Sequence, residues 1–381
     1  MPKKFSMTLA TKKYNNNLMK NKYSTDGKVV HLSTEEDINQ KLSKIIGKKF
    51  SDYRKSWDEA NKFNLITKFP LFLHIELNQT CNYKCPHCII GNPDEVEKLY
   101  NKNENLDFND YKKIVDEGSK YNCPSLSAQG DNEPFLIKNM EEYIYYAHKK
   151  GFIDIMTNTN GSPINITRSK KILDSGLTRM RFSLDAFTDE TYKKVRVGAI
   201  DLDKVKRNIF NFLDLKEKGG YKLPIVGVSF CKLKQNEHEL DEFKNYWKDK
   251  VDLVTIQTFA PPTQNKSAYH EFYPEDQFYD DEVVDFKCNQ PFQRIHIRNH
   301  EMFPCCYSLV MGDKGTENYK NFVIGNIKNM SIYDAWNGEK MKKLRQIQLD
   351  GKFKENPTCA MCVKYTFPTK KFIKSEEIRK N

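Results

Sequence analysis

The chain has 381 residues, of which 30% are charged and 12% aromatic, and its mean hydropathy is −0.74. This length predicts roughly two domains, and no stretch approaches the roughly 18 apolar residues of a membrane span. The N-terminus lacks the apolar run of a secretory signal, so we expect a cytoplasmic protein whose clustered cysteines bind metal or do redox chemistry. The net charge of +11 is spread along the chain and is compatible with nucleic acid, an anionic substrate or a lysine-rich proteome.

The first 70 residues are polar, with helices expected over 37–46 and 52–61. After them, strand-like apolar runs alternate with helix-like patterns. The strand-like runs lie at 71–77, 123–129, 152–158, 178–185, 224–231 and 253–259. Because strands that alternate with helices indicate parallel βαβ units, we predict an α/β fold with a partial (β/α)6 barrel of the TIM type.

Polar residues follow several of these strands, where the reacting groups of such a barrel gather. The first strand leads into CNYKCPHC, which contains Cys81, Cys85 and Cys88. GDNEP follows the second strand and TNTNG the third. At the end of the fourth, alternation places Ser183 and Asp185 on one face. The pattern therefore predicts a functional site at this rim of the barrel.

The pattern changes beyond residue 262. The segment 263–285 is acidic and irregular, and we expect a linker or lid there. A hairpin that turns at Asn299 and His300 follows, and then a helix capped by Ser331. The predicted divisions are an N-terminal extension (1–70), a barrel (71–262) and a linker with a small C-terminal domain (263–381).

The first cysteine group suits an iron–sulfur cluster, because three thiolates can hold a 4Fe–4S cluster and leave one iron open. Zinc is the alternative, but His87 lies between two of the thiols and is badly placed as a fourth ligand. A second group of cysteines lies in the C-terminal region: Cys288, Cys305, Cys306, Cys359 and Cys362. Its C-x2-C pair with distant partners fits either a cluster or structural zinc.

With the surrounding ELNQTCNYKC, the first cysteine group resembles the radical S-adenosylmethionine (radical SAM) enzymes. In that family S-adenosylmethionine (SAM) binds the open iron and is cleaved to a 5′-deoxyadenosyl radical. SAQGDNEPFL and FSLDAFTDETYKKVRVG resemble the segments that bind SAM. The residues that the resemblance implies are His87 for adenine, Gln129, Gly130 and Glu133 for the methionine amino group, and Ser183 and Arg196 for the ribose and the methionine carboxylate.

The C-terminal cysteines resemble the SPASM/twitch subclass, which carries one or two auxiliary clusters. Fuller SPASM domains have more cysteines in this region than the five found here. The resemblance therefore implies one auxiliary 4Fe–4S cluster, with these ligands: Cys288, either Cys305 or Cys306, Cys359 and Cys362.

The leading expectation is an enzyme that abstracts a hydrogen atom and dehydrogenates a small carbohydrate-like or nucleotide-linked molecule, with an external electron donor such as flavodoxin or ferredoxin. An epimerase is an alternative, in which Cys231 would donate hydrogen if its strand face is inward. A peptide- or protein-modifying enzyme is another, although the first 70 residues show no winged-helix pattern. A zinc-containing nucleic-acid-binding protein would instead require a basic stripe, whereas acidic residues are interspersed throughout.

Overall fold

The computed structural model describes residues 20–23, 29–33, 37–99, 105–263, 266–275, 286–305 and 316–366. In this part of the chain, one sheet of eleven strands has the order β1-β2-β8-β7-β6-β5-β4-β3-β9-β10-β11. Six parallel strands form the barrel wall: β3 (Phe72–Glu76), β4 (Ser125–Ser127), β5 (Asp154–Thr159), β6 (Arg179–Ser183), β7 (Ile225–Lys232) and β8 (Leu253–Thr258). They coincide with the six predicted runs, which confirms the partial barrel.

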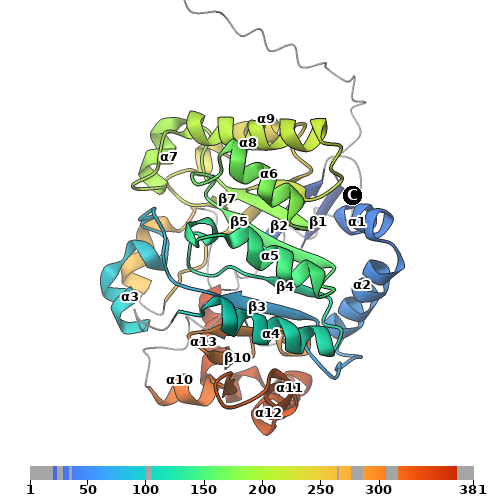
Figure 1. Ribbon diagram of the computed structural model, residues 1–381. Coiled ribbons are helices and arrows are strands. Elements are labelled where there is room, and N and C mark those ends of the chain that lie inside the picture. Colours follow the sequence, from blue (N-terminus) through green and yellow to red (C-terminus); the bar gives the residue numbers. More distant parts are fainter. Residues whose placement is uncertain are drawn as a thin grey trace, which may run out of the picture.

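Helices connect these strands and cover the outer face of the sheet (Figure 1). The helix α4 (Phe108–Lys120) begins where the Asp107 carboxylate accepts hydrogen bonds from two backbone amides. In α8 (Leu202–Lys218), Phe212 packs on Phe182, an outward-facing residue of β6. The other connecting helices are α3 (Pro93–Leu99), α5 (Met140–Lys149), α6 (Ile166–Asp174), α7 (Asp189–Val195) and α9 (Leu240–Trp247). Among the described helices, none combines the length and apolarity needed to cross a membrane.

The described part of residues 1–70 contacts the barrel directly. Helices α1 (Ile38–Ile46) and α2 (Lys48–Asn61) lie at the beginning of the strands, at the right of Figure 1. Tyr53 of α2 donates a 3.3 Å hydrogen bond to Ser125 in β4, and Trp57 packs edge-on against Phe72 in β3. The strand β2 (Val29–Ser33) pairs antiparallel with β8, and β1 (Lys20–Tyr23) with β2.

The C-terminal region continues the sheet on the other side. Strand β9 (Arg294–Arg298) pairs parallel with β3 and places His296 opposite His74. Strand β10 (Glu301–Phe303) returns antiparallel through Asn299 and His300, whose φ angles are 49° and 65°. The predicted hairpin is therefore present. Because the sheet is continuous on both sides of the barrel, the boundaries proposed at residues 70 and 262 stay predictions.

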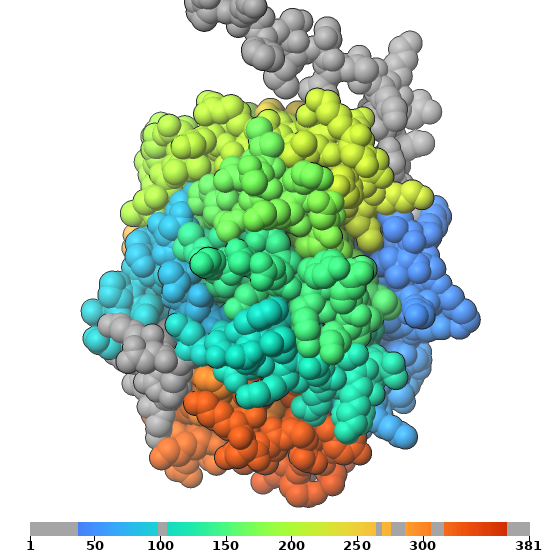
Figure 2. All heavy atoms as spheres, in the orientation of Figure 1, coloured from blue at the N-terminus to red at the C-terminus, as the bar shows by residue number. Residues whose placement is uncertain are grey.

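Short helices complete this end of the molecule, which is orange and red in Figures 1 and 2. The helix expected after Ser331 is in fact two helices, because the chain is extended at Gly338. Ser331 caps the first of them, as expected, and accepts a 3.0 Å hydrogen bond from the amide of Asp334. The elements of this region are β11 (Gly325–Asn326), α10 (Glu317–Phe322), α11 (Ile332–Asn337), α12 (Glu339–Leu349) and α13 (Pro357–Thr366).

Candidate active site

A cavity of about 430 Å³ lies at the carboxyl ends of the barrel strands. It is lined by every residue that the sequence nominates for the radical site: Cys81, Cys85, His87, Cys88, Gln129, Gly130, Glu133, Ser183, Arg196 and Cys231. These residues come from loops and strand ends that are far apart in the sequence. The fold thus brings them together, and their individual roles stay predictions.

The loop after β3 presents three thiols to this cavity. It turns tightly, because the amide of Cys88 donates a 2.9 Å hydrogen bond to the carbonyl of Cys85. Gly91 is required nearby, since a Cβ there would lie 2.1 Å from that same carbonyl oxygen. Burial raises the pKa of all three thiols, Cys81, Cys85 and Cys88.

Such thiols remain protonated unless a cation is present, and the irons of a cluster supply that positive charge. No three His, Cys, Asp or Glu side chains in the described ranges are arranged to hold one metal ion. The cysteine loop presents three thiols at short spacing, and this donor set fits a 4Fe–4S cluster.

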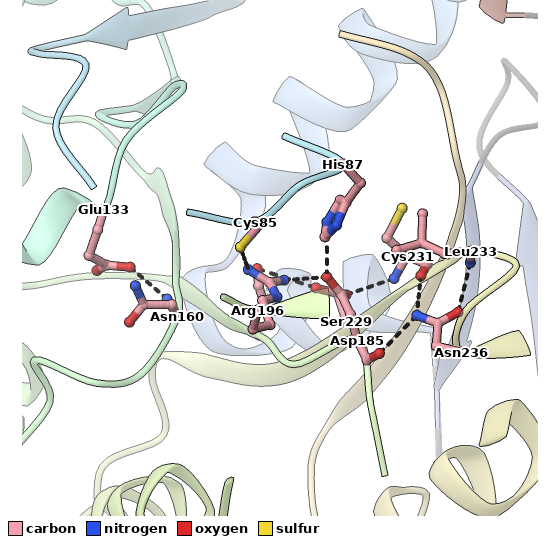
Figure 3. A network of polar contacts seen from close by, with 11 residues as sticks. Cys85, His87, Glu133, Asn160, Asp185, Arg196, Ser229, Cys231, Leu233 and Asn236 are labelled. Atoms are coloured by element: carbon pink, nitrogen blue, oxygen red, sulfur yellow. Dashed lines mark hydrogen bonds and ion pairs between the residues drawn. The ribbon is translucent and has the colours of Figure 1, made fainter. Parts of the chain in front are cut away.

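Asp185 connects three parts of the site (Figure 3). Its carboxylate forms an ion pair with Arg196 and accepts a 2.8 Å hydrogen bond from the amide of Cys231. The His87 ring nitrogen Nε2 lies 3.6 Å from the same carboxylate. Asp185 itself has a left-handed backbone with φ of 59°, and Asn236 donates a 2.8 Å hydrogen bond to its carbonyl. Although burial acts to raise it, Arg196 and His87 hold the pKa of Asp185 below its ordinary value.

Arg196 ends α7 and lies between Asp185 and the thiol of Cys85, with its Nη1 atom 3.9 Å from the sulfur. Burial acts to lower its pKa, but Asp185 and Cys85 raise it, so this guanidinium is a fixed cation. If Arg196 binds the methionine carboxylate as the resemblance implies, it must share its charge with Asp185. Ser183 lies beside it in the cavity and accepts a 3.4 Å hydrogen bond from Ser229.

Glu133 is a buried carboxylate. It accepts hydrogen bonds from the Thr159 hydroxyl at 2.7 Å and from the Asn160 amide at 2.6 Å. Burial raises the pKa of Glu133 to about 7, and these hydrogen bonds act in the opposite direction. A cation bound beside it would favour its charged form, so Glu133 suits the ammonium group of SAM.

The neighbouring loop is held close to β3. A Cβ at Gly130 would lie 2.3 Å from the Glu76 carboxylate, so only glycine fits there without a shift. The side chain of Gln129 accepts a hydrogen bond from the amide of Asn158. That contact ties the loop to β5.

Cys231 lies near the end of β7 and, like Ser229, lines the cavity. The face of β7 that carries Cys231 therefore points into the barrel, as the epimerase alternative requires. Burial raises the pKa of the Cys231 thiol, which keeps its S–H bond intact at neutral pH. A protonated thiol is the form that can donate a hydrogen atom.

The C-terminal thiols gather at a second place. Gln348 joins two of them, since it accepts a 2.8 Å hydrogen bond from the Cys288 amide and its Nε2 lies 3.5 Å from the Cys359 sulfur. Burial raises the pKa of Cys359, and nearby Cys288 and Cys362 raise it further. Cys305 packs against the same apolar cluster as Cys359. The other predicted ligand, Cys306, lies outside the described residues.

Several polar residues of the cavity were assigned no role by the sequence-based prediction, among them Asn160, Asp185 and Gln257. The strand-end rule placed the first two at the predicted rim, because they follow the third and fourth barrel strands, but it assigned them no contact. Gln257 could have been found from the inward alternation of β8.

Two family profiles match the chain. The one described as "Radical SAM superfamily" matches residues 75–246, and the SPASM profile, described as "Iron-sulfur cluster-binding domain", matches residues 288–363. A curated relative from Methanocaldococcus jannaschii, "Probable GTP 3',8-cyclase", is 25% identical over 198 residues. That match covers 52% of this chain and 62% of the relative, less than two thirds of its length. The "Fe-coproporphyrin III synthase" of Methanosarcina barkeri is 29% identical over 164 residues, which cover 43% of this chain and 37% of that one.

Solved structures show the same fold. "Native anSMEcpe with bound AdoMet" has a TM-score of 0.54 at 14% identity, covering 81% of this chain and 95% of that one. The structure of Streptococcus suis SuiB bound to precursor peptide SuiA has a TM-score of 0.56 at 14% identity, covering 78% and 71%. At such identities the likeness extends to the fold alone.

Proposed function

Because the chain belongs to the radical SAM superfamily and carries a SPASM domain, we propose that it dehydrogenates a small carbohydrate-like or nucleotide-linked molecule. One observation carries the substrate class. Besides the nominated residues, the cavity is lined by hydroxyl and amide side chains: Asn132, Asn158, Thr159, Asn160, Ser229, Gln257 and Thr258. Such side chains hydrogen-bond a substrate rich in hydroxyl groups.

In this proposal the residues of the chain bind the cluster and SAM and orient SAM in the cavity. Cys81, Cys85 and Cys88 would hold a 4Fe–4S cluster, which together with bound SAM would supply the radical chemistry that removes a hydrogen atom from the substrate. The contacts to SAM are Glu133 to its ammonium group, Arg196 to its carboxylate, Ser183 to its ribose and His87 to its adenine. Asp185 positions two of these groups by its contacts with Arg196 and His87.

Oxidation requires an acceptor for the electron left on the substrate. The thiols of Cys288, Cys359 and Cys362, with that of either Cys305 or Cys306, would hold a single auxiliary cluster, which would supply that acceptor. Curated relatives named GTP 3',8-cyclase act, by that name, on a nucleotide. This supports a nucleotide-linked or otherwise anionic substrate, although the relatives are cyclases.

Epimerisation is the second candidate, and one observation favours it. Cys231 lines the cavity that contains the cysteine loop, and its thiol is protonated. A thiol so placed suits the return of a hydrogen atom to a substrate radical.

The test is anaerobic reconstitution with iron and sulfide, followed by incubation with SAM, a reductant, and pools of sugars, sugar phosphates and nucleotide sugars. Dehydrogenation predicts a product lighter by two hydrogen atoms, formed together with 5′-deoxyadenosine. A product of unchanged mass and inverted configuration would favour the epimerase. A colourless zinc protein that forms no 5′-deoxyadenosine would contradict both.

A further inference from the structure

Arg181 is a cation inside the barrel, and none of the contacts proposed for SAM or for the clusters involves it. It lies at the middle of β6, where its neighbours Met180 and Phe182 are buried toward the helices. Arg181 therefore faces inward, on the same side as Ser183, which is two residues further along the strand. The side chain keeps accessible surface although the strands surround it.

The partners of Arg181 are few. Its Nε atom donates a 3.1 Å hydrogen bond to the Asn158 side chain. Among the described residues, no carboxylate forms an ion pair with it within 4.0 Å. Three other arginines of this part of the barrel do have such a partner: Arg168 pairs with Glu141, Arg179 with Asp154 and Arg196 with Asp185.

An enclosed cation without a counter-ion is costly, because it loses hydration and gains no opposite charge. The pKa of Arg181 reflects this, since burial lowers it to about 10 and the more distant Asp185 acts in the opposite direction. Even so, the group is charged at neutral pH. The guanidinium is therefore available to an incoming anion.

Arg181 is not itself among the residues that line the cavity, but it lies next to a residue that does. Its neighbour on β5 is Asn158, which lines the cavity, and its neighbour on β7 is Gly227, where a Cβ would lie 2.9 Å from the carbonyl oxygen of Leu253. Ser183 also lines the cavity. Because a strand rises about 3.3 Å per residue, Arg181 lies about 6.6 Å deeper in the barrel than Ser183.

We propose that Arg181 binds an anionic group of the substrate, a carboxylate or a phosphate, at the inner end of the active-site cavity. The planar guanidinium presents two Nη nitrogens that match either group. The identity of the occupant as substrate rests on the proposed function, whereas anion binding itself does not. The substrate would then be an anionic molecule.

The test compares R181M with the matched control R179M, two residues earlier on the same inward face. Thermal unfolding of the reconstituted holoenzyme is measured with SAM present, at constant ionic strength, in chloride, phosphate or acetate. In chloride, R181M should unfold at the parent temperature or above it, because a buried unpaired charge is removed. R179M should unfold at a lower temperature, because it leaves the buried Asp154 unpaired.

Phosphate or acetate should raise the unfolding temperature of the parent, and R181M should bind that anion about tenfold or more weakly. A response to phosphate assigns a phosphorylated substrate, and one to acetate assigns a carboxylate. R181K should bind with intermediate affinity, since it keeps the charge and loses the planar fork. Equal responses of the parent and R181M, no response of the parent to either anion, or destabilisation of R181M like that of R179M would each overturn the proposal.

Cleavage of SAM by the same preparations separates this inference from the proposed function. A parent enzyme that cleaves SAM but shows no Arg181-dependent anion binding contradicts the inference alone. Arg181-dependent anion binding by a parent enzyme that forms no 5′-deoxyadenosine contradicts the proposed function alone.

Discussion

The backbone amide of Cys231 donates a 2.8 Å hydrogen bond to Oδ1 of Asp185. This contact joins the end of β7 to the residues that follow β6. The other carboxylate oxygen of Asp185 pairs with Arg196. One carboxylate therefore positions both a proposed hydrogen donor and a proposed SAM ligand.

Replacing Asp185 by Asn should destabilise the protein while keeping the local shape. Asn adopts the left-handed backbone of this position more readily than most residues, so the main loss is the charge opposite Arg196. An unpaired buried cation should lower the free energy of unfolding by about 3 kcal/mol, measured by urea titration. The control is D214N, at an exposed pair whose nitrogen and oxygen are 2.8 Å apart. Equal stability of the two variants would show that the Asp185 pair contributes nothing.

Asp252 predicts a pH-dependent contribution to stability. It joins two helices to the sheet, since it lies 2.5 Å from Lys41 of α1 and 3.7 Å from Lys216 of α8, and it accepts a 2.9 Å hydrogen bond from the Val226 amide. Although burial acts to raise the pKa of Asp252, these groups hold it below its ordinary value. Its stabilisation is therefore fully present above the unfolded pKa of about 3.9 and is lost as the pH falls through the folded value.

The variant D252N should show this dependence. At pH 7 it should unfold with a free energy roughly 2 kcal/mol below that of the parent. The difference should shrink as the pH falls below about 4. Urea titrations of both proteins over this range measure it, and a difference that does not change with pH would refute the assignment.

The auxiliary site predicts a change in iron content. Replacing Cys359 and Cys362 together by Ala should remove about four irons per chain, because two thiolates cannot hold the cluster. SAM cleavage should continue in part, since the first cysteine group is unchanged. The same substitution at Cys123, which is buried in the core, should leave the iron content unchanged. Unaltered iron in the double variant would point to zinc or to no metal.

The sequence predicts local features well, because each one depends on residues that are close together in the chain. The six strands of the barrel, the turn at Asn299 and the cap at Ser331 are all present. Pairing of β2 with β8 and of β9 with β3 joins segments that are far apart. No period or turn signal in the chain specifies such pairs, so the continuous sheet could not be predicted.

The same reason explains the missed roles of individual residues. Alternation placed Asp185 near Ser183, but its contacts with Arg196 and Cys231 depend on the tertiary structure. In the sequence, Arg181 resembles Arg179, and only the position of Asp154 distinguishes the paired cation from the unpaired one. Which charges are compensated is a property of the folded barrel.

The first cysteine group predicts a strict requirement for all three thiols. Replacing Cys81, Cys85 or Cys88 by Ala should abolish formation of 5′-deoxyadenosine, because two thiolates cannot hold the cluster that binds SAM. Cys123→Ala is again the control, since that thiol does not line the cavity. The assay is chromatography of the nucleoside products after anaerobic incubation with SAM and a reductant. Full SAM cleavage by any of the three variants would be incompatible with the proposed cluster.

The choice between dehydrogenation and epimerisation depends on Cys231. A dehydrogenase passes an electron from the substrate radical to an acceptor and needs no further thiol. An epimerase must return a hydrogen atom, and the protonated thiol of Cys231 exchanges its hydrogen with solvent. Once a substrate is known, the parent and Cys231→Ala are compared in deuterium oxide, with mass spectrometry of the product.

We expect oxidation, with unimpaired turnover of Cys231→Ala and no solvent deuterium at the reacting carbon. Cys231→Ser is the matched control for shape, because a hydroxyl donates a hydrogen atom far less readily than a thiol. Loss of turnover in the Ala variant alone would indicate packing, and loss in both would indicate hydrogen donation. Deuterium that enters the product of the parent and is absent with both variants would replace the dehydrogenase by the epimerase.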